Sequence, residues 1–115
     1  MSELINASRR NSIVTARRLL DDGVNPNIQD GRGNTALIWA SRINNIELVR
    51  LLLDRGAHPN IQDEARGTSL MYASDIGNID IVRLLLDRGA NPNIQDEGGY
   101  TALMLALHQG HTDIV

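Results

Sequence analysis

Apolar residues recur along this chain at the spacing of amphipathic helices. Within 46–53, Ile46, Val49 and Leu52 fall on one face of a helix. The stretch 79–86 repeats the pattern, with IDIVRLLL following the earlier IELVRLLL. Each stretch comes after another apolar segment, ALIWASR or SLMYASD. The pattern therefore predicts pairs of short helices.

The ends of the predicted helices carry residues with matching backbone preferences. Each first helix is preceded by a hydroxyl residue: Thr35, Thr68 and Thr101, with Ser2 in the same register. Such a hydroxyl accepts from the free N–H groups of a first helical turn. Later in the same frame stand Asn11, Asn44, Gly77 and Gly110. Asparagine and glycine enter the left-handed region most readily, so this column predicts the C-cap where the chain reverses.

Glycine and proline end each predicted second helix. The glycines are Gly23, Gly56 and Gly89, and the prolines that follow are Pro26, Pro59 and Pro92. Because proline cannot continue a helix, the segment from each proline to the next threonine is predicted to project as a β-hairpin or loop, here called a finger. The segments DDGVNPNIQD, DRGAHPNIQD and DRGANPNIQD begin 33 residues apart. The repeating unit is thus helix, turn, helix, finger.

These motifs resemble the ankyrin repeat family, whose unit of about 33 residues carries a Thr-Pro-Leu-His motif and a Leu-Leu-x-x-Gly-Ala motif. The first motif appears as Thr35-Ala36-Leu37-Ile38, Thr68-Ser69-Leu70-Met71 and Thr101-Ala102-Leu103-Met104, without its proline and histidine. The second matches fully at 52–57 and 85–90. The resemblance implies an all-α solenoid of stacked helix-turn-helix units joined by projecting fingers. The missing histidine implies more apolar packing.

The period divides the chain into repeats expected at 1–29, 30–62, 63–95 and 96–115. The first is the more polar, with Asn6, Arg9, Arg10 and Thr15 where the next has Trp39, Arg42, Ile43 and Leu48. We expect it to be an N-terminal cap, since one face of a terminal repeat meets water.

The last repeat, 96–115, is expected to be truncated. Val115 aligns with Val49, so the sequence stops inside a predicted second helix. We expect a piece of a longer array of repeats, in which Leu84 and Leu85 lose part of their cover. The resulting apolar end could pair with another copy or with missing chain.

Composition and charge narrow the classes of partner. The formal net charge is −3, and all eleven cations are arginines interspersed with fourteen acids. Nucleic-acid binding requires a clustered positive surface, so no nucleic-acid partner is expected. The lack of cysteine excludes disulfides and thiolate metal sites and permits a reducing compartment. Without a signal peptide or apolar span, we expect a cytoplasmic or nuclear protein and no membrane partner.

The polar residues do not form a catalytic or metal-binding pattern. His108 and His111 lie on either side of the predicted turn at Gly110, and His58 is a repeat away. Ser8, Ser41 and Ser74 recur in register, as small residues at helix contacts do, whereas a catalytic group is unique. No nucleophile elbow or phosphate loop is present. We therefore expect no enzyme, no metal and no cofactor.

Other repeated polar residues have structural interpretations. Asn27, Asn60 and Asn93 are expected to bond local backbone in turns, and the resemblance implies that such an asparagine can be a substrate for hydroxylation. Arg50 and Arg83 are expected to pair with Glu47 and Asp80 on the convex surface. Asp54 and Asp87 are expected to be solvated helix ends.

A partner surface is indicated by positions that vary between otherwise similar repeats. The resemblance implies that targets contact the fingers and the ends of the first helices. The expected partner-binding residues are Arg9, Arg10, Arg32, Asn34, Arg42, Ile43, Glu64, Ala65, Asp75, Ile76, Glu97, Tyr100, His108 and Gln109. Arginines dominate the N-terminal half and acids the other, which predicts a partner segment of opposite gradient.

Two aromatic residues in the first helices, Trp39 and Tyr72, have two interpretations. They are either groove anchors for a partner or bulky residues that bridge adjacent first helices. The leading functional hypothesis is a non-catalytic module that binds a protein on its concave face. The alternative is a structural spacer or assembly element that self-associates through its C-terminal end.

Overall fold

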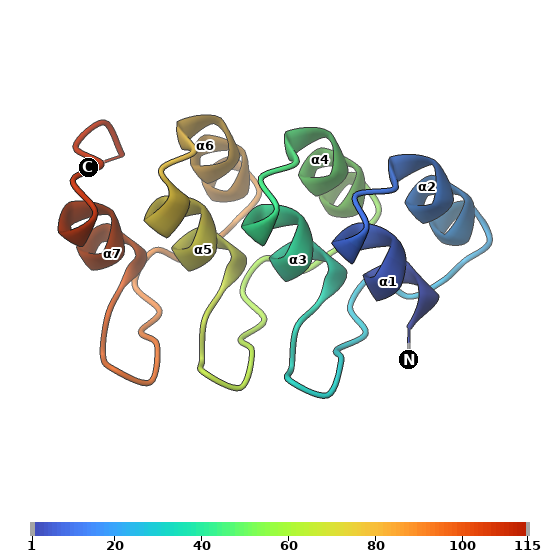
Figure 1. Ribbon diagram of the computed structural model, residues 1–115, viewed down its shortest axis with the longest axis horizontal. Helices are drawn as coiled ribbons and strands as arrows, with labels where there is room; N and C mark the ends of the chain where they lie inside the picture. Colours follow the sequence, from blue (N-terminus) through green and yellow to red (C-terminus); the bar gives the residue numbers. More distant parts are fainter. Residues whose placement is uncertain (1, 115) are drawn as a thin grey trace.

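The computed structural model describes residues 2–114. Its helices are α1 (Glu3–Arg9), α2 (Ile13–Asp21), α3 (Ala36–Arg42), α4 (Ile46–Asp54), α5 (Ser69–Ile76), α6 (Ile79–Asp87) and α7 (Ala102–His108). Figure 1 shows the first helices, α1, α3, α5 and α7, in one row and the second helices, α2, α4 and α6, in another. The array measures 39 × 26 × 22 Å. The expected all-α solenoid is confirmed.

The predicted helix starts are confirmed at the atomic level. The side-chain oxygens of Ser2, Thr35, Thr68 and Thr101 accept from the backbone N–H three residues later. Ser12, Asn45 and Asn78 cap the second helices in the same way. Each cap satisfies a donor that the helix itself leaves free.

The turn within each helix pair uses the predicted left-handed residue. The φ angles are 63° at Asn11, 65° at Asn44, 91° at Gly77 and 78° at Gly110. The asparagines also reach the next repeat, since Asn78 Nδ2 donates to Asn44 Oδ1 at 2.5 Å. At Gly77 a histidine ring takes that space, because a Cβ on Gly77 would lie 2.5 Å from His111 Cε1.

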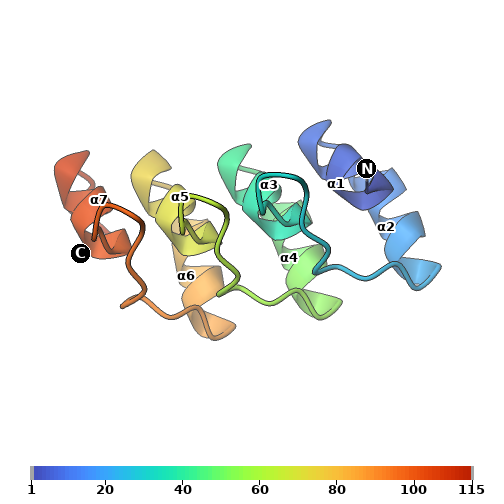
Figure 2. The same cartoon turned by 90° about the horizontal axis from the view of Figure 1, so that it is seen from below.

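The fingers are loops, not the β-hairpins allowed for by the sequence, and residues 2–114 contain no strand. In the second finger, Asp63 N donates to Gly67 O at 2.9 Å and closes a turn too short to begin a ladder. Neighbouring fingers are joined where Glu64 N donates to Arg32 O at 2.9 Å. Figure 2 shows each finger alongside the first helix that follows it.

The core lies between the two rows of helices. Its fully buried side chains include Leu37, Leu48, Leu52, Ile81 and Leu85. The expectation that Leu85 loses cover is wrong, because Leu85 is fully buried in a core cluster that includes Ala102 of α7 and against which Ile114 packs, whereas Leu84 is half-buried. Residues 112–114 form a turn where a helix was predicted. Val115 lies outside the described residues. The exposed apolar side chains near this end are Leu86, Leu103, Met104 and Leu107.

Asparagines of the fingers tie each repeat to the next. Asn27 Nδ2 donates to Gly56 O at 3.2 Å, and Asn27 Oδ1 accepts from His58 N at 2.8 Å. Asn60 makes both contacts one repeat later. The predicted local bonding is wrong for these two side chains, since stacking brings the free carbonyl at the end of a second helix within their reach.

Ion pairs also connect repeats. They join second helices of adjacent repeats, as Arg55–Asp21 and Arg88–Asp54. The predicted pairs of Arg50 and Arg83 within one helix are wrong, since neither arginine forms an ion pair within residues 2–114. Asp54 is paired at 2.7 Å rather than only solvated.

Candidate functional site

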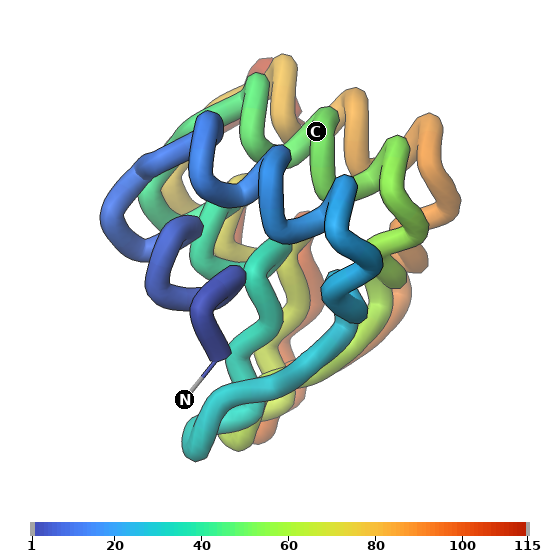
Figure 3. Tube along the Cα trace, turned by 90° about the vertical axis from the view of Figure 1, so that its right-hand side faces the viewer, coloured from blue at the N-terminus to red at the C-terminus, as the bar shows by residue number. Residues whose placement is uncertain are grey.

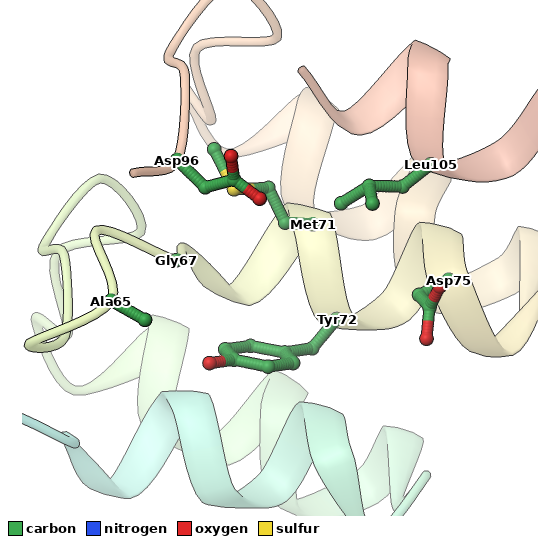
Figure 4. A pocket seen from close by; sticks show the side chains of 7 residues that line it. All are labelled: Ala65, Gly67, Met71, Tyr72, Asp75, Asp96 and Leu105. Carbon is green, nitrogen blue, oxygen red and sulfur yellow. The ribbon is translucent and has the colours of Figure 1, made fainter. Parts of the chain in front are cut away.

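The surface between the fingers and the first helices is here called the finger groove. Figure 3 shows, from the N-terminal end, the fingers beyond the first helices and the second helices on the far side. Two cavities open into this finger groove. The first, the basic pocket, is lined by Ile5, Arg9, Asp30, Gly31, Arg32 and Trp39. The second, the acidic pocket, is lined by Ala65, Gly67, Met71, Tyr72, Asp75, Asp96 and Leu105 (Figure 4).

Arginines and aromatic rings alternate along the first helices of the groove. The guanidinium carbon of Arg9 lies 5.0 Å from the centre of the Trp39 ring. That of Arg42 lies 4.7 Å from Trp39 and 5.0 Å from Tyr72. These separations are those of cation–π contacts. We call Arg9, Trp39, Arg42 and Tyr72 the stacked ladder. Its contacts follow the interpretation in which Trp39 and Tyr72 bridge adjacent first helices.

Each ladder ring is also bonded at its edge to a carboxylate of its own repeat. Trp39 Nε1 donates to Asp30 Oδ2 at 3.1 Å, and the hydroxyl of Tyr72 donates to Asp63 Oδ2. Burial, assisted by the bond to Asp63, raises the pKa of Tyr72 to about 12, so its hydroxyl remains protonated at neutral pH. The rings are therefore held by both their faces and their polar edges.

The carboxylates themselves are positioned by the fingers. Asp30 Oδ1 accepts from the backbone N–H of Arg32 and of Asn34, each at 2.9 Å. Partial burial alone would raise the pKa of Asp30, but these bonds and the one from Trp39 hold it below its usual value. Asp63 and Asp96 bind their own fingers through the same oxygen. These aspartates recur every 33 residues, and this recurrence could have identified them as structural residues, although the sequence analysis did not single them out.

The third repeat of this arrangement lacks an aromatic ring. Leu105 takes the register of Trp39 and Tyr72. As a result, none of the hydrogen bonds among residues 2–114 reaches Asp96 Oδ2. Figure 4 shows Asp96 and Leu105 across the acidic pocket from Tyr72. The equivalent carboxylate oxygens of Asp30 and Asp63 each accept from a ring, whereas Asp96 Oδ2, at the acidic pocket, has no such donor among the described residues.

A second carboxylate lines the acidic pocket. Asp75 occupies the register of Arg9 and Arg42, and its Oδ1 accepts from Gln109 Nε2 at 3.1 Å. The backbone carbonyl of Asp75 lies 3.0 Å from His111 Nε2. These contacts hold α5 against the last turn of the chain. They leave Asp75 Oδ2 without a partner within residues 2–114.

Glycine at position 67 leaves room for the Tyr72 ring at the acidic pocket. A Cβ at Gly67 would lie 2.9 Å from the hydroxyl oxygen of Tyr72. A side chain there would push the ring away from Asp63. The small residue therefore lets the finger close over the edge of the Tyr72 ring.

Most of the predicted partner-binding residues lie at the surface. Those that are exposed are Arg9, Arg10, Arg32, Arg42, Glu64, Ile76, Glu97, Tyr100, His108 and Gln109. Ile43, Ala65 and Asp75 are half-buried. Arg9 and Arg32 both line the basic pocket, and Ala65 and Asp75 both line the acidic one.

Two predicted residues lie elsewhere than expected. Asn34 is 3% exposed, because the base of the finger turns its side chain inward, and it is corrected to a structural residue. Arg10 lines a separate depression with Glu3 and Thr15 at the N-terminal end of the array. A partner in the finger groove would therefore meet Arg9 and Arg32 rather than Arg10.

The described part of the chain contains neither a metal-binding cluster nor a membrane-spanning helix. Residues 2–114 contain no group of three or more histidine, aspartate or glutamate side chains placed to hold a metal ion. Across the same residues, every helix is too short or too polar to cross a bilayer.

Comparison with known proteins gave one family. A family model described as ankyrin repeats (3 copies) matches residues 4–96 and 58–115. No curated protein matches the chain. Ankyrin repeats generally mediate protein–protein interaction, and the family is typically non-catalytic.

Proposed function

Because the chain belongs to the ankyrin repeat family, we propose that it is a non-catalytic module that binds a protein segment in the finger groove. The stacked ladder is the observation that carries this proposal. Arg9 and Arg42 are exposed, yet their guanidinium groups are held against rings. Charged side chains that are already ordered lose less entropy on binding.

The charge distribution of the groove indicates the chemistry of the segment. Arg9, Arg32 and Arg42 lie in its N-terminal half. Glu64, Asp75, Asp96 and Glu97 lie in its C-terminal half. A segment that is acidic where it meets the arginines and basic at the other end complements both halves.

Affinity capture from the source cell tests the groove. The variant carries Arg42→Glu, Asp75→Arg and Tyr100→Ala, which leaves the net charge unchanged. The matched control carries Arg50→Glu and Asp80→Arg on exposed positions of the second helices, also without a change in net charge. We expect the groove variant to lose proteins that the wild type and the control retain. Unchanged capture by a folded groove variant would show that the partner binds elsewhere.

We also propose that the module works in the cytosol or the nucleus, without nucleic-acid or membrane partners. The absence of cysteine and the mildly acidic charge support this. Fluorescence microscopy of a tagged chain tests the compartment, and a gel-shift assay with duplex DNA tests nucleic-acid binding. Secretion of the chain, or a shift at physiological salt, would contradict the proposal.

Self-association is a second candidate function, favoured by exposed apolar residues on α7. Leu103 is 46% exposed, Met104 46% and Leu107 52%. The depression at the opposite end of the array is lined by Glu3, Asn6, Ala7, Arg10, Ser12 and Thr15. Since the exposed apolar side chains cluster on α7 while the opposite depression is mostly polar, two copies would pair through the same surface and form a closed dimer.

Light scattering over a concentration series tests this candidate. We expect the apparent mass to double for the wild type and to stay monomeric for Leu107→Asp. Val14→Asp is the matched control, because Val14 is 78% exposed in α2. A monomeric mass of the wild type at every concentration would refute self-association.

A further inference from the structure

The stacked ladder ends at Tyr72 because the next position in the arginine register is not an arginine. Position 42 is arginine and stacks on Trp39 of its own helix at 4.7 Å. The equivalent position for Tyr72 is 75, where the chain has aspartate. Arg42 is the guanidinium that stacks on Tyr72, and no second one does so within residues 2–114. Trp39 therefore stacks with two guanidinium groups, whereas Tyr72, one repeat later, stacks with one in the described part of the chain.

The side of Tyr72 away from Arg42 faces the acidic pocket. Figure 4 shows the ring on the side of α5 that faces α3, which carries Arg42, and shows Asp96, Met71 and Leu105 on the side toward α7. The cavity volume is about 190 Å³. A cavity of about 150 Å³ holds a benzene-sized group, so a planar guanidinium fits this one.

Two carboxylates border the same space, and each has a free oxygen. Asp96 Oδ2 lacks the ring donor that serves Asp30 and Asp63, because Leu105 is not aromatic. Asp75 has only its Oδ1 bonded, to Gln109. The walls between them are apolar, formed by Met71 and Leu105. An arginine side chain fits this pocket better than lysine does. Its planar guanidinium can stack on an aromatic face and donate to carboxylates, and its alkyl stem can lie along apolar walls.

We propose that the acidic pocket receives an arginine side chain from the protein partner, which stacks on Tyr72 and donates to Asp75 and Asp96. The arginine of the partner thereby replaces the arginine that this chain lacks at position 75. This inference rests on the proposed function of the groove and specifies the residue recognised at its C-terminal half. Asp96 also contributes, after burial and Asp63, to the raised pKa of Tyr72.

Small probes test the pocket without knowledge of the partner. Acetyl-arginine amide, acetyl-lysine amide and acetyl-citrulline amide are titrated into the chain, and backbone amide shifts are followed by NMR. Citrulline has the shape of arginine without its charge. We expect saturable shifts centred on residues 65–75 and 96–105 with arginine, weaker binding with lysine and none with citrulline.

Two variants make the assignment specific. Asp96→Asn keeps an oxygen for the finger turn but removes the charge, and it is expected to weaken arginine binding about tenfold. Leu105→Tyr restores the ring found in the two earlier repeats and is expected to block the pocket by bonding Asp96. Asp80→Asn removes an exposed acid on α6, outside the groove, and is expected to leave binding unchanged.

The outcomes separate this inference from the proposed function. Equal binding of citrulline or lysine, shifts spread over the whole surface, or folded Asp96→Asn and Leu105→Tyr variants that bind arginine normally would overturn the arginine pocket. If the pocket fails while capture still depends on the groove, the proposed function stands and only this inference is lost. If arginine binds but capture ignores the groove variant, the proposed function fails instead.

Discussion

The indole Nε1 of Trp39 donates to Asp30 Oδ2 at 3.1 Å and so fastens a first helix to the finger before it. Both residues are half-buried. Trp39→Phe keeps the ring but leaves the carboxylate oxygen without this donor. We expect a loss of about 1 kcal/mol in the free energy of unfolding, measured by urea denaturation. Full retention of stability would show that water replaces the donor without cost.

The carboxyl group of Asp30 makes stability depend on pH. Its pKa in the folded chain lies below the usual aspartate value of 3.8 because hydrogen bonds outweigh burial. The stabilisation is therefore present above the unfolded value and is lost as pH falls through the folded pKa. Urea denaturation between about pH 5 and pH 2 should show a steeper loss for the wild type than for Asp30→Asn. The same change at the exposed Asp22 serves as control, and equal slopes for Asp30→Asn and the wild type would contradict the prediction.

The side chain of Leu52 is fully buried between the helix rows. Leu52→Ala should cost roughly 2–5 kcal/mol through lost burial and a residual cavity. Because small domains have only about 5–15 kcal/mol in total, that loss can unfold the array. Circular dichroism during heating measures the effect, and Val14→Ala on the exposed face of α2 should change the melting temperature little. An unchanged midpoint for Leu52→Ala would mean that the core does not depend on this side chain.

The ring of His111 occupies the space that a side chain at Gly77 would need. A Cβ on Gly77 would meet His111 Cε1 at 2.5 Å, so Gly77→Asn should destabilise the fold by about 1–3 kcal/mol. One repeat earlier, the register holds Asn44 and Asn78, which bond each other. The double variant Gly77→Asn with His111→Asn restores that pair and should recover part of the loss. Strictly additive effects in the double-mutant cycle would show that the two positions are independent.

Asn60 and Asn93 share a register but have different contacts. Asn60 Nδ2 donates to Gly89 O at 3.1 Å, and its Oδ1 accepts from Asn91 N at 2.7 Å. The side chain of Asn93 makes no hydrogen bond within residues 2–114. Asn60→Ala should therefore cost about 1–2 kcal/mol, and Asn93→Ala close to nothing. Equal losses in urea denaturation would refute the role of Asn60 between repeats.

The sequence by itself determined the repeat, its helices and their ends. Thr35 caps α3 because its hydroxyl lies within reach of an N–H three residues away, and Asn44 reverses the chain because its own backbone tolerates a φ of 65°. Both are local properties. They depend on neighbours along the chain, so spacing alone was enough to predict them.

The tertiary structure decided which polar groups meet. Asn27 bonds Gly56, 29 residues away, and Arg42 reaches Tyr72 on the next first helix. The sequence predicted local turn bonds for the first and left two interpretations open for the second. Partners so distant in sequence are selected by the offset between stacked repeats, which no local spacing encodes. The acidic pocket arises in the same way, since it needs α5, a finger and α7 side by side before the substitution of leucine for a ring leaves Asp96 open.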